Sequence, residues 1–182
     1  MQHKEKVFLH PERVEHHLGI REHMKVADFG SGSGEFALIA ARHVGQGGLV
    51  SAVDIRQGPL RDLEAKAKLQ GLSNIETIRA DLEKAHSSGL ADNSQDVVLL
   101  ITVLFQSKHP LKIVAEALRV LKPRGRLVLI DWEKENQGFG PPQDLRHAKE
   151  TLQGEVVSHG STLVEDFDAG SFHYGLIFIK NA

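Results

Sequence analysis

The sequence predicts an α/β fold in which helices cover both faces of a mostly parallel sheet. Three observations predict this class. Short apolar runs alternate with amphipathic segments along the chain. The runs are apolar without interruption, as in strands that are buried on both faces. The connections between the segments are short, which is typical of repeated strand–helix–strand units.

The elements of the parallel part follow from this alternation. Gly45 ends one helix, and Pro110 begins another. The turn Pro123-Arg124-Gly125 is expected to separate the last helix of this part from its last strand. In chain order, we expect the strand Val26–Phe29, the helix Glu35–Val44, the strand Leu49–Val53, a helix over 58–69, the strands Ile75–Ile78 and Val97–Ile101, the helix Pro110–Leu121 and the strand Arg126–Ile130.

The C-terminal part breaks the alternation. Asp144–Val157 is predicted to form a helix, followed by the strands Thr162–Phe167 and Phe172–Ile179. The loop between these two strands is too short for a parallel crossover, so the strands should pair as a hairpin. The complete sheet then has seven strands, with one antiparallel strand at its end. The segment Trp132–Pro142 is read either as an ordinary surface loop, which is the simpler interpretation, or as a lid.

Length and composition narrow the class of protein. The 182 residues suit one domain, 1–182, and the net charge of −2 gives no drive toward nucleic acid or an anionic membrane. The absence of cysteine excludes disulfides, thiolate nucleophiles and cysteine metal sites. The N-terminus is too polar for a signal peptide, and the longest apolar run, Val97–Leu104, is far shorter than the ~20 residues of a membrane helix. We therefore expect a cytoplasmic protein without nucleic-acid or membrane partners, and self-association into a homo-oligomer stays open.

A glycine cluster follows the first predicted strand. The segment reads Val26-Ala27-Asp28-Phe29-Gly30-Ser31-Gly32-Ser33-Gly34-Glu35 and leads directly into a helix. Ligands of open α/β sheets bind beyond the carboxyl ends of the strands, and glycines let the backbone approach them closely. A turn that only joins strand to helix is the alternative.

Two acidic residues sharpen this interpretation. Asp54 closes the second strand, where a carboxylate can accept hydrogen bonds from both ribose hydroxyls of an adenosine. Asp81 follows the third strand, where it can reach an adenine edge. Each acid alone can instead be a helix cap or a turn residue. Three such features at the right strand ends favour an adenosine ligand.

The glycine spacing argues against two common adenosine ligands. A nicotinamide fingerprint needs a small residue three positions after its second glycine, where this chain has Glu35. No lysine follows as in a P-loop, which disfavours nucleoside triphosphates.

From about residue 26 to 179, the sequence resembles the class I S-adenosylmethionine-dependent methyltransferases. The resemblance rests on five segments: VADFGSGSG, AVDI with Asp54, RADLEK with Asp81, DVVLLITVLFQ, and EALRVLKPRGRLVLID from Glu116 to Asp131. The last segment resembles the small-molecule branch that includes quinone-biosynthesis methyltransferases. One departure is Arg124, where the family commonly has glycine; we expect it to affect only the turn. The resemblance implies a Rossmann-like, doubly wound sheet and S-adenosylmethionine as cofactor.

The resemblance also implies roles for individual residues. Gly30, Gly32 and Gly34, with Ser31 between them, would pass under the methionine part of the cofactor. Asp28 would orient this loop, and Asp54 would hold the ribose. Ile55, Asp81 and Leu82 would contact the adenine. Ile101 and Thr102 would lie beside the sulfonium.

The sequence also offers candidate residues for the part of the site that would hold the methyl acceptor. Methyl transfer from a sulfonium has a neutral leaving group, so positioning and exclusion of water can supply most of the rate, and a base is needed only where the acceptor must lose a proton. His109 and Trp132 are the catalytic candidates, and Gln106 and Ser107 are expected on the acceptor side. A helix-entry histidine is the more ordinary interpretation of His109.

The N-terminal segment, residues 1–24, is predicted to be helical and to lie over the cleft. It holds five of the 11 histidines, namely His3, His10, His16, His17 and His23. Their spacing matches no metal-ligand motif, so a solvated histidine-rich helix is favoured and no metal is expected.

Three functions remain as hypotheses. The first is methyl transfer from S-adenosylmethionine to a small-molecule acceptor. The second is a non-catalytic cofactor-binding domain that regulates a partner. The third, disfavoured by Glu35, is a nicotinamide-linked oxidoreductase.

Overall fold

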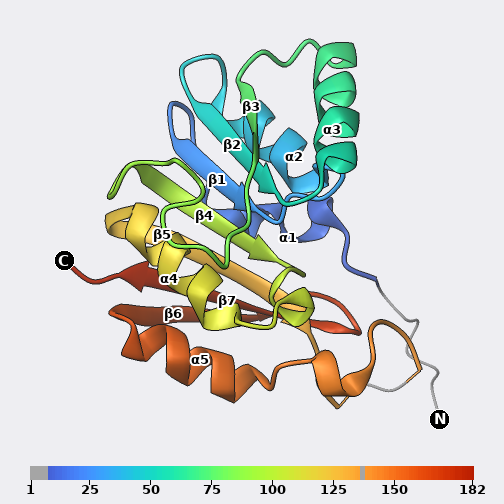
Figure 1. Ribbon diagram of the computed structural model, residues 1–182, viewed down its shortest axis with the longest axis vertical. Helices are drawn as coiled ribbons and strands as arrows, with labels where there is room; N and C mark the ends of the chain where they lie inside the picture. The colour runs from blue at the N-terminus through green and yellow to red at the C-terminus, as the bar shows by residue number, and fades with distance from the viewer. Residues whose placement is uncertain (1–7, 136–137) are drawn as a thin grey trace.

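The computed structural model describes residues 8–135 and 138–182, which form one seven-stranded sheet between two layers of helices (Figure 1). The strand order is β3-β2-β1-β4-β5-β7-β6. The elements are α1 (Pro11–Leu18), β1 (Lys25–Phe29), α2 (Glu35–Val44), β2 (Leu49–Asp54), α3 (Gln57–Leu69), β3 (Ile75–Arg79), β4 (Gln95–Ile101), η1 (Leu104–Gln106), α4 (Pro110–Val120), β5 (Leu121–Trp132), η2 (Gln143–Leu145), α5 (Lys149–Ser158), β6 (Ser161–Asp168) and β7 (His173–Lys180).

The two faces of the sheet carry separate apolar cores. Along β4, Val97, Leu99 and Ile101 pack into the core beneath α1, α2 and α3. Val98 and Leu100 alternate with them and pack into the core beneath α4 and α5. Because successive strand side chains point to opposite faces, an uninterrupted apolar run is what a strand between two helix layers requires. The predicted doubly wound α/β fold is therefore confirmed.

The chain reverses its direction of travel across the sheet next to β1. Strand β1 pairs in parallel with β2 on one side and with β4 on the other. This is the switch point where the connections on either side diverge and leave a crevice at the carboxyl ends of the strands. The glycine cluster follows β1 at this crevice.

The C-terminal strands form the predicted hairpin, but the antiparallel strand lies inside the sheet. Strand β7 pairs antiparallel with β5 and with β6, so β6 is the edge. The burial of the two strands agrees with these places, because β7 is buried along most of its length while β6 alternates between buried and exposed residues.

Strand β5 begins earlier than predicted. The expected break at Pro123-Arg124-Gly125 lies within the strand, which starts at Leu121 directly after α4. Gln95 of β4 pairs with Leu121, and Val97 pairs with Arg126, so the extra residues of β5 bulge between these two pairs. Arg124 adopts a φ of 63°, the left-handed conformation that glycine accommodates more easily.

The predicted helix Asp144–Val157 is also corrected. Residues Gln143–Leu145 form a separate short helix, and α5 begins only at Lys149. Arg146 and Ala148 between them are extended, with ψ near 139° and 136°. The reason is a buried arginine: the Arg146 side chain turns inward to bind loop carbonyls, which interrupts the helix.

The N-terminal segment is helical only over α1, Pro11–Leu18; the other described residues before β1, 8–10 and 19–24, are not helical, so the predicted helix is shorter than expected. Helix α1 packs against α2 through the buried side chains of Val14 and Leu18. The His17 ring stacks on Phe167, and its Nδ1 lies 2.5 Å from a carboxylate oxygen of Glu165. No residue of α1 lines the cavity described below, and the predicted part before residue 8 lies outside the described residues. Within the described ranges, no helix has the length and apolar character to cross a membrane.

Candidate functional site

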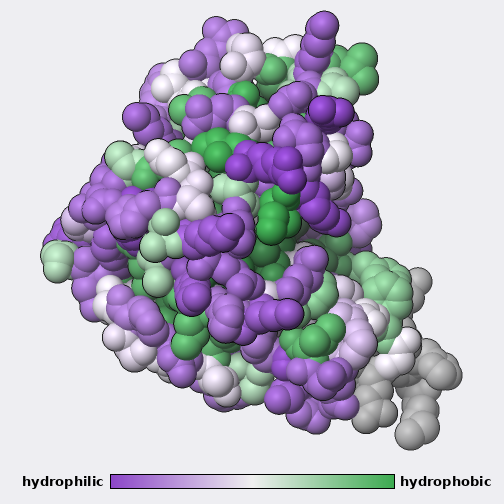
Figure 2. Space-filling model, viewed as in Figure 1, coloured by the Kyte–Doolittle hydropathy of each residue, from purple (hydrophilic) through white to green (hydrophobic). Residues whose placement is uncertain are grey.

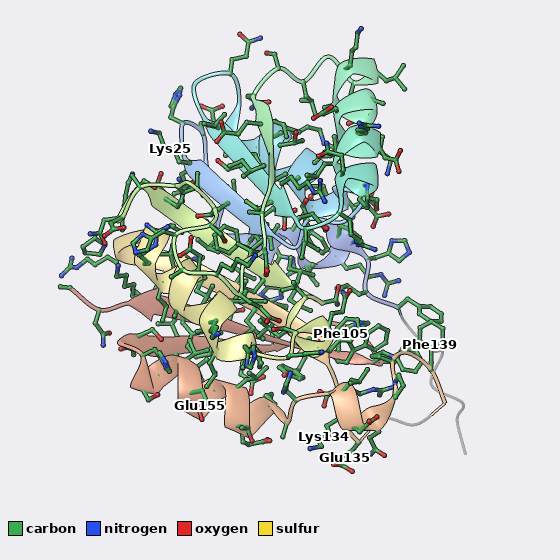
Figure 3. The ribbon with its side chains drawn as sticks, in the orientation of Figure 1. Lys25, Phe105, Lys134, Glu135, Phe139 and Glu155 are labelled. Atoms are coloured by element: carbon green, nitrogen blue, oxygen red, sulfur yellow. The ribbon has the colours of Figure 1, made fainter. Side chains whose placement is uncertain are left out.

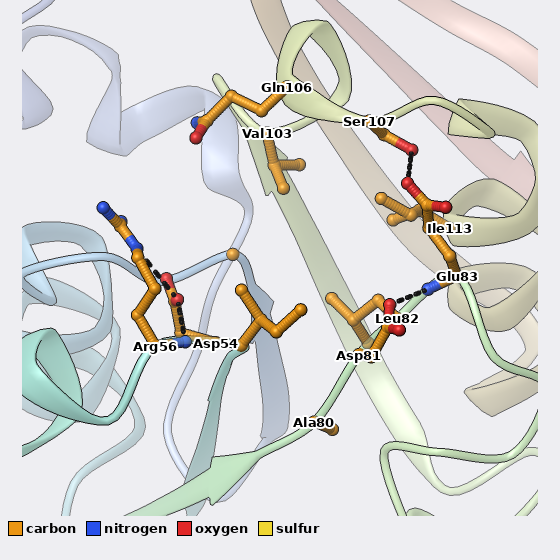
Figure 4. Close-up of a pocket in the computed structure, with 12 residues that line it drawn as sticks. Asp54, Arg56, Ala80, Asp81, Leu82, Glu83, Val103, Gln106, Ser107 and Ile113 are labelled. Carbon is orange, nitrogen blue, oxygen red and sulfur yellow. Dashed lines mark hydrogen bonds and ion pairs between the residues drawn. The ribbon is translucent and has the colours of Figure 1, made fainter.

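A cavity opens at the carboxyl ends of β2, β3 and β4 (Figure 4). In the orientation of Figure 1, Figure 2 shows apolar residues in a hollow between the part that carries α3 and the part that carries α4. Five of the predicted cofactor residues line the cavity together: Gly30, Asp54, Ile55, Asp81 and Leu82. Segments that are distant in sequence therefore meet at one place because parallel strands end at one edge of the sheet.

Asp54 joins the end of β2 to the glycine loop. Its side chain is nearly buried, and its Oδ2 accepts a hydrogen bond from the backbone N–H of Gly32 at 2.9 Å. The Oδ1 oxygen accepts one from the backbone N–H of Arg56 at 2.8 Å. The Arg56 side chain also donates to Oδ1 through Nε at 3.4 Å. A carboxylate has about four acceptor positions, so Oδ2, with one donor, retains capacity for a ligand hydroxyl.

The glycines of the loop differ in what surrounds them. A Cβ at Gly30 would lie 2.3 Å from Val103, and one at Gly34 would lie 2.3 Å from Leu63, so both sites are closed by packing. Gly32 has a φ of +52° and nothing within 4 Å of the position of a Cβ. The backbone of Gly32 is thus open to a ligand, while its neighbours fix the course of the loop.

Asp28 lies under this loop, and burial raises its pKa to about 7, with a further rise from the charge of Asp54 and an opposing hydrogen bond from the Ala37 backbone. Its Oδ2, like the hydroxyl of Ser31, is buried and has no hydrogen-bond partner among the described residues. The base of the loop therefore holds polar atoms that are available to a ligand or a water.

The opposite wall of the cavity is tied together by Glu83. The Ser107 hydroxyl donates to Glu83 Oε1 at 2.6 Å, and the Lys108 backbone N–H donates to the same oxygen at 3.0 Å. These hydrogen bonds, with Ser107 as the largest cause, lower the pKa of Glu83. Asp81 accepts from the Glu83 backbone N–H at 3.1 Å. The loop after β3 and the loop after β4 are therefore held as one wall.

Two predicted residues at the end of β4 do not line the cavity. Ile101 is buried in the sheet, and Thr102 has a φ of 50°, which is unusual for a β-branched residue. The Thr102 N–H donates to the carbonyl of Ile130 at 2.8 Å, which holds this strained turn. The turn directs Val103 against Gly30, and Val103 lines the cavity in place of its two predecessors.

The catalytic candidates lie apart from the cavity. His109 is exposed at the start of α4, where its backbone N–H donates to the Ser107 hydroxyl. Trp132 ends β5 within a group of aromatic rings. We call this group the aromatic cluster; it comprises Phe8, Phe105, Trp132, Phe139, Phe172 and His173. Gln106 and Ser107, expected beside the acceptor, instead line the cavity with Asp54 and Asp81.

Sequence reasoning missed several residues that line the cavity: Arg56, Ala80, Glu83, Val103 and Ile113. Four of them are within two positions of a predicted residue, so a wider window around each strand end would have included them. Ile113 on α4 has no local signal, because its place depends on how α4 packs on the sheet. Across the described chain, no group of three His, Asp or Glu side chains is placed to hold a metal ion.

Comparison with known proteins identifies the family of this chain. The model of a methyltransferase domain family matches residues 20–172. Ubiquinone/menaquinone biosynthesis C-methyltransferase UbiE of Pseudomonas entomophila is 33% identical over 117 residues, covering 64% of this chain and 44% of the relative. UbiE of Cronobacter sakazakii is 29% identical over 157 residues, covering 86% of this chain and 59% of the relative. The chain thus spans about half the length of these curated relatives.

A solved structure has the same architecture over nearly the whole chain. A SAM-dependent methyltransferase from Aquifex aeolicus has a TM-score of 0.85 and 27% identity, covering 95% of this chain and 90% of the other. The [4+2]-cyclase SpnF has a TM-score of 0.79 at 18% identity, covering 93% of this chain and 79% of the other, a likeness of fold alone. Since such a fold also occurs in a protein described as a cyclase, the reaction has to be argued from the site.

Proposed function

Because the chain belongs to the class I S-adenosylmethionine-dependent methyltransferases, we propose that it transfers a methyl group from S-adenosylmethionine to a small-molecule acceptor. One observation carries the proposal. Gly30 of the glycine loop, Asp54 and Asp81 line one cavity at the point where the strand order reverses. Ligands of open α/β sheets bind at such a point.

The residues of the cavity fit the parts of this cofactor. Gly32 does not line the cavity but is hydrogen-bonded to Asp54, which does, and its open backbone suits the methionine part. Oδ2 of the nearly buried Asp54 has acceptor capacity for a ribose hydroxyl. Ile55 and Leu82 offer apolar surface, and Asp81 offers a carboxylate at its edge, as an adenine ring requires. When bound, the cofactor supplies a methyl group on a positively charged sulfonium.

The contribution of the chain is mainly to bind, orient and exclude water. The methyl donor leaves as a neutral thioether, so no oxyanion site is required, and correct orientation alone can contribute on the order of 7–11 kcal/mol. We assign this orientation to the glycine loop and to the strained turn at Thr102. Ile101 and Thr102 would border the sulfonium, although they do not line the cavity that holds Asp54.

The acceptor is best sought beside the ends of β4 and β5, where the aromatic cluster lies. The curated relatives are named for ubiquinone and menaquinone biosynthesis, so quinone precursors are the first acceptors to test. His109 is exposed outside the cavity, which makes a general-base role for it unfavourable. We propose no base, because an acceptor that loses its proton to water needs none.

Turnover with an acceptor panel tests the proposal. Formation of S-adenosylhomocysteine is followed for the wild type and for Asp54→Ala with the same panel. The proposal expects acceptor-dependent product in the wild type and its loss in the variant. Cofactor binding without turnover of any acceptor would support the non-catalytic binding domain, and binding of NADH alone would support the oxidoreductase.

Cytoplasmic location and the oligomeric state stay predictions of the sequence. The absence of cysteine suits a reducing compartment and so supports a cytoplasmic protein. Light scattering on the purified chain measures its oligomeric state.

A further inference from the structure

The segment after β5 is fastened by one buried arginine. Arg146 is 5% exposed and donates to the backbone carbonyls of Glu133, Phe139 and Pro141 at 2.6–2.9 Å. The planar guanidinium holds donors in a fixed fork, so it fixes the spacing of the three carbonyls. The described part of this segment is therefore a wall with a set shape rather than a free lid.

This wall packs closely against the indole ring of Trp132. A Cβ at Gly140, which has a φ of +92°, would lie 2.4 Å from the indole ring. The guanidinium carbon of Arg146 lies 5.6 Å from the centre of the same ring, and the ring of His173 lies 4.1 Å from it. Trp132 is thus held on several sides.

The indole N–H of Trp132 is a hydrogen-bond donor without an acceptor among the described residues. Its Nε1 is buried and has no partner among the described residues, and neither has Nδ1 of His173. Burial, with the charge of Arg146, lowers the pKa of His173 to about 4, so this imidazole is neutral near pH 7. A buried donor without a partner is costly, and such groups are often completed by a ligand or a water.

The aromatic cluster continues to the wall of the cofactor cavity. Phe105 contacts Trp132 edge to face at 6.2 Å, and its neighbour Gln106 lines the cavity. The ring of Phe139 lies 6.0 Å from that of Trp132, and Figure 3 shows Phe105 and Phe139 on the same side of the molecule. A ligand on this cluster would lie next to the end of β4, where the methyl group is proposed to be.

We infer that Trp132 is a specificity-determining residue whose indole N–H binds an uncharged oxygen on a flat ring of the acceptor, and that Arg146 is the positioning residue that fixes Trp132 for this contact. The inference rests on the proposed function, because the acceptor has to lie beside the methyl donor. It adds what that function does not contain: the group that recognises the acceptor, and the reason that Arg146 binds the carbonyls of Glu133, Phe139 and Pro141.

The wild-type protein allows a direct test. Trp132 is the single tryptophan, so a nitrogen-15 spectrum has one indole N–H signal. Acetophenone, a flat ring with a carbonyl, is titrated in the presence of S-adenosylhomocysteine. We expect a saturable downfield shift of the indole signal. Isopropylbenzene lacks the oxygen and cyclohexyl methyl ketone lacks the flat ring, so both should bind about fivefold more weakly, as the loss of one neutral hydrogen bond or of ring stacking implies.

The role of Arg146 is tested with a matched pair of variants. Arg146→Lys keeps the charge but loses the fork. Arg119→Lys makes the same change at a remote arginine that binds Glu116 and the Leu90 carbonyl. In Arg146→Lys we expect Trp132 fluorescence to shift to the red and acetophenone to bind about tenfold more weakly, since a mobile side chain has to be ordered on binding. Arg119→Lys should leave both readouts unchanged.

Three results would overturn the inference: an indole signal that does not respond to acetophenone, a response as large for isopropylbenzene, or an equal fluorescence change in the two variants. If Arg146→Lys does not fold, the wild-type titration still tests whether the Trp132 indole N–H binds the ligand oxygen. Binding of S-adenosylhomocysteine is measured in the same samples. Its failure would count against the proposed function, whereas normal cofactor binding with an unresponsive indole would count against this inference alone.

Discussion

The carboxylate of Asp54 accepts a hydrogen bond from the backbone N–H of Gly32 at 2.9 Å. The contact joins the end of β2 to the loop after β1, and it also places Asp54 at the wall of the cavity. One side chain therefore shapes the loop and lines the cavity. Both roles rest on the position of Asp54 at a strand end beside the switch point.

The first prediction concerns Asp54. We expect Asp54→Ala to weaken binding of S-adenosylhomocysteine at least about tenfold, because hydrogen bonds to a charged group contribute about 1.5–3 kcal/mol. Asp62→Ala, at an exposed site on α3, is the matched control and should leave affinity unchanged. Calorimetric titration of both variants makes the comparison. Equal affinity in Asp54→Ala and the wild type would refute the assignment.

The second prediction concerns the open glycine. Gly32→Ala and Gly71→Ala both place a side chain at positive φ where nothing lies within 4 Å, so both should lose roughly 1–2 kcal/mol of stability. Only Gly32→Ala should also weaken cofactor binding, by about tenfold or more, because its methyl group would enter the space proposed for the ligand. Urea unfolding and calorimetry separate the two effects. A similar affinity in the two variants would contradict the proposed place of the methionine part.

The third prediction concerns pH. The pKa of Asp28 is raised from 3.8 to about 7, chiefly by burial. Between these values the folded protein holds a proton that the unfolded chain has released. The free energy of unfolding therefore falls as the pH rises through this window, and the stabilising contribution of the neutral carboxyl is lost near pH 7.

Asp28→Asn removes this dependence because its side chain cannot ionise. Relative to the wild type, we expect the variant to gain about 3 kcal/mol of stability between about pH 5 and about pH 8. Urea unfolding at both pH values measures the change, and Asp62→Asn is the control. Parallel pH profiles for Asp28→Asn and the wild type would show that Asp28 ionises normally in the folded state.

The fourth prediction concerns the wall that Glu83 holds together. Ser107→Ala removes the 2.6 Å hydrogen bond between the loops after β3 and β4. We expect cofactor affinity to fall about fivefold, the effect of one hydrogen bond. Ser158→Ala removes a hydroxyl that donates to the Glu155 carbonyl on α5 and should have no such effect. An unchanged affinity in Ser107→Ala would mean that the wall does not need this contact.

Most of the fold could be predicted from local patterns. The strands at the centre of the sheet are apolar on both faces, so their sequences identify them without knowledge of the partners. The start of β5 could not be predicted, because Leu121 joins the strand through its pairing with Gln95 of β4. The start of α5 was missed because a charged residue is usually exposed, whereas Arg146 is buried and donates hydrogen bonds to loop carbonyls.

The cavity was predictable where its residues end strands. Asp54 and Asp81 could be located from the sequence because each follows an apolar run. The hydrogen bond between Glu83 and Ser107 could not, because it joins two loops that meet only in the folded chain. The strained turn at Thr102 likewise has no local signal, since threonine rarely adopts positive φ.

Thermal unfolding with separate additions of S-adenosylmethionine, S-adenosylhomocysteine and NADH tests the central claim most directly. A ligand at about 100 times its dissociation constant stabilises the folded state by about 2.7 kcal/mol. We predict a rise of roughly 5–10 °C with either of the first two ligands, and no rise with NADH. A rise with NADH alone would contradict the account, because it would assign the glycine loop and Asp54 to a nicotinamide cofactor.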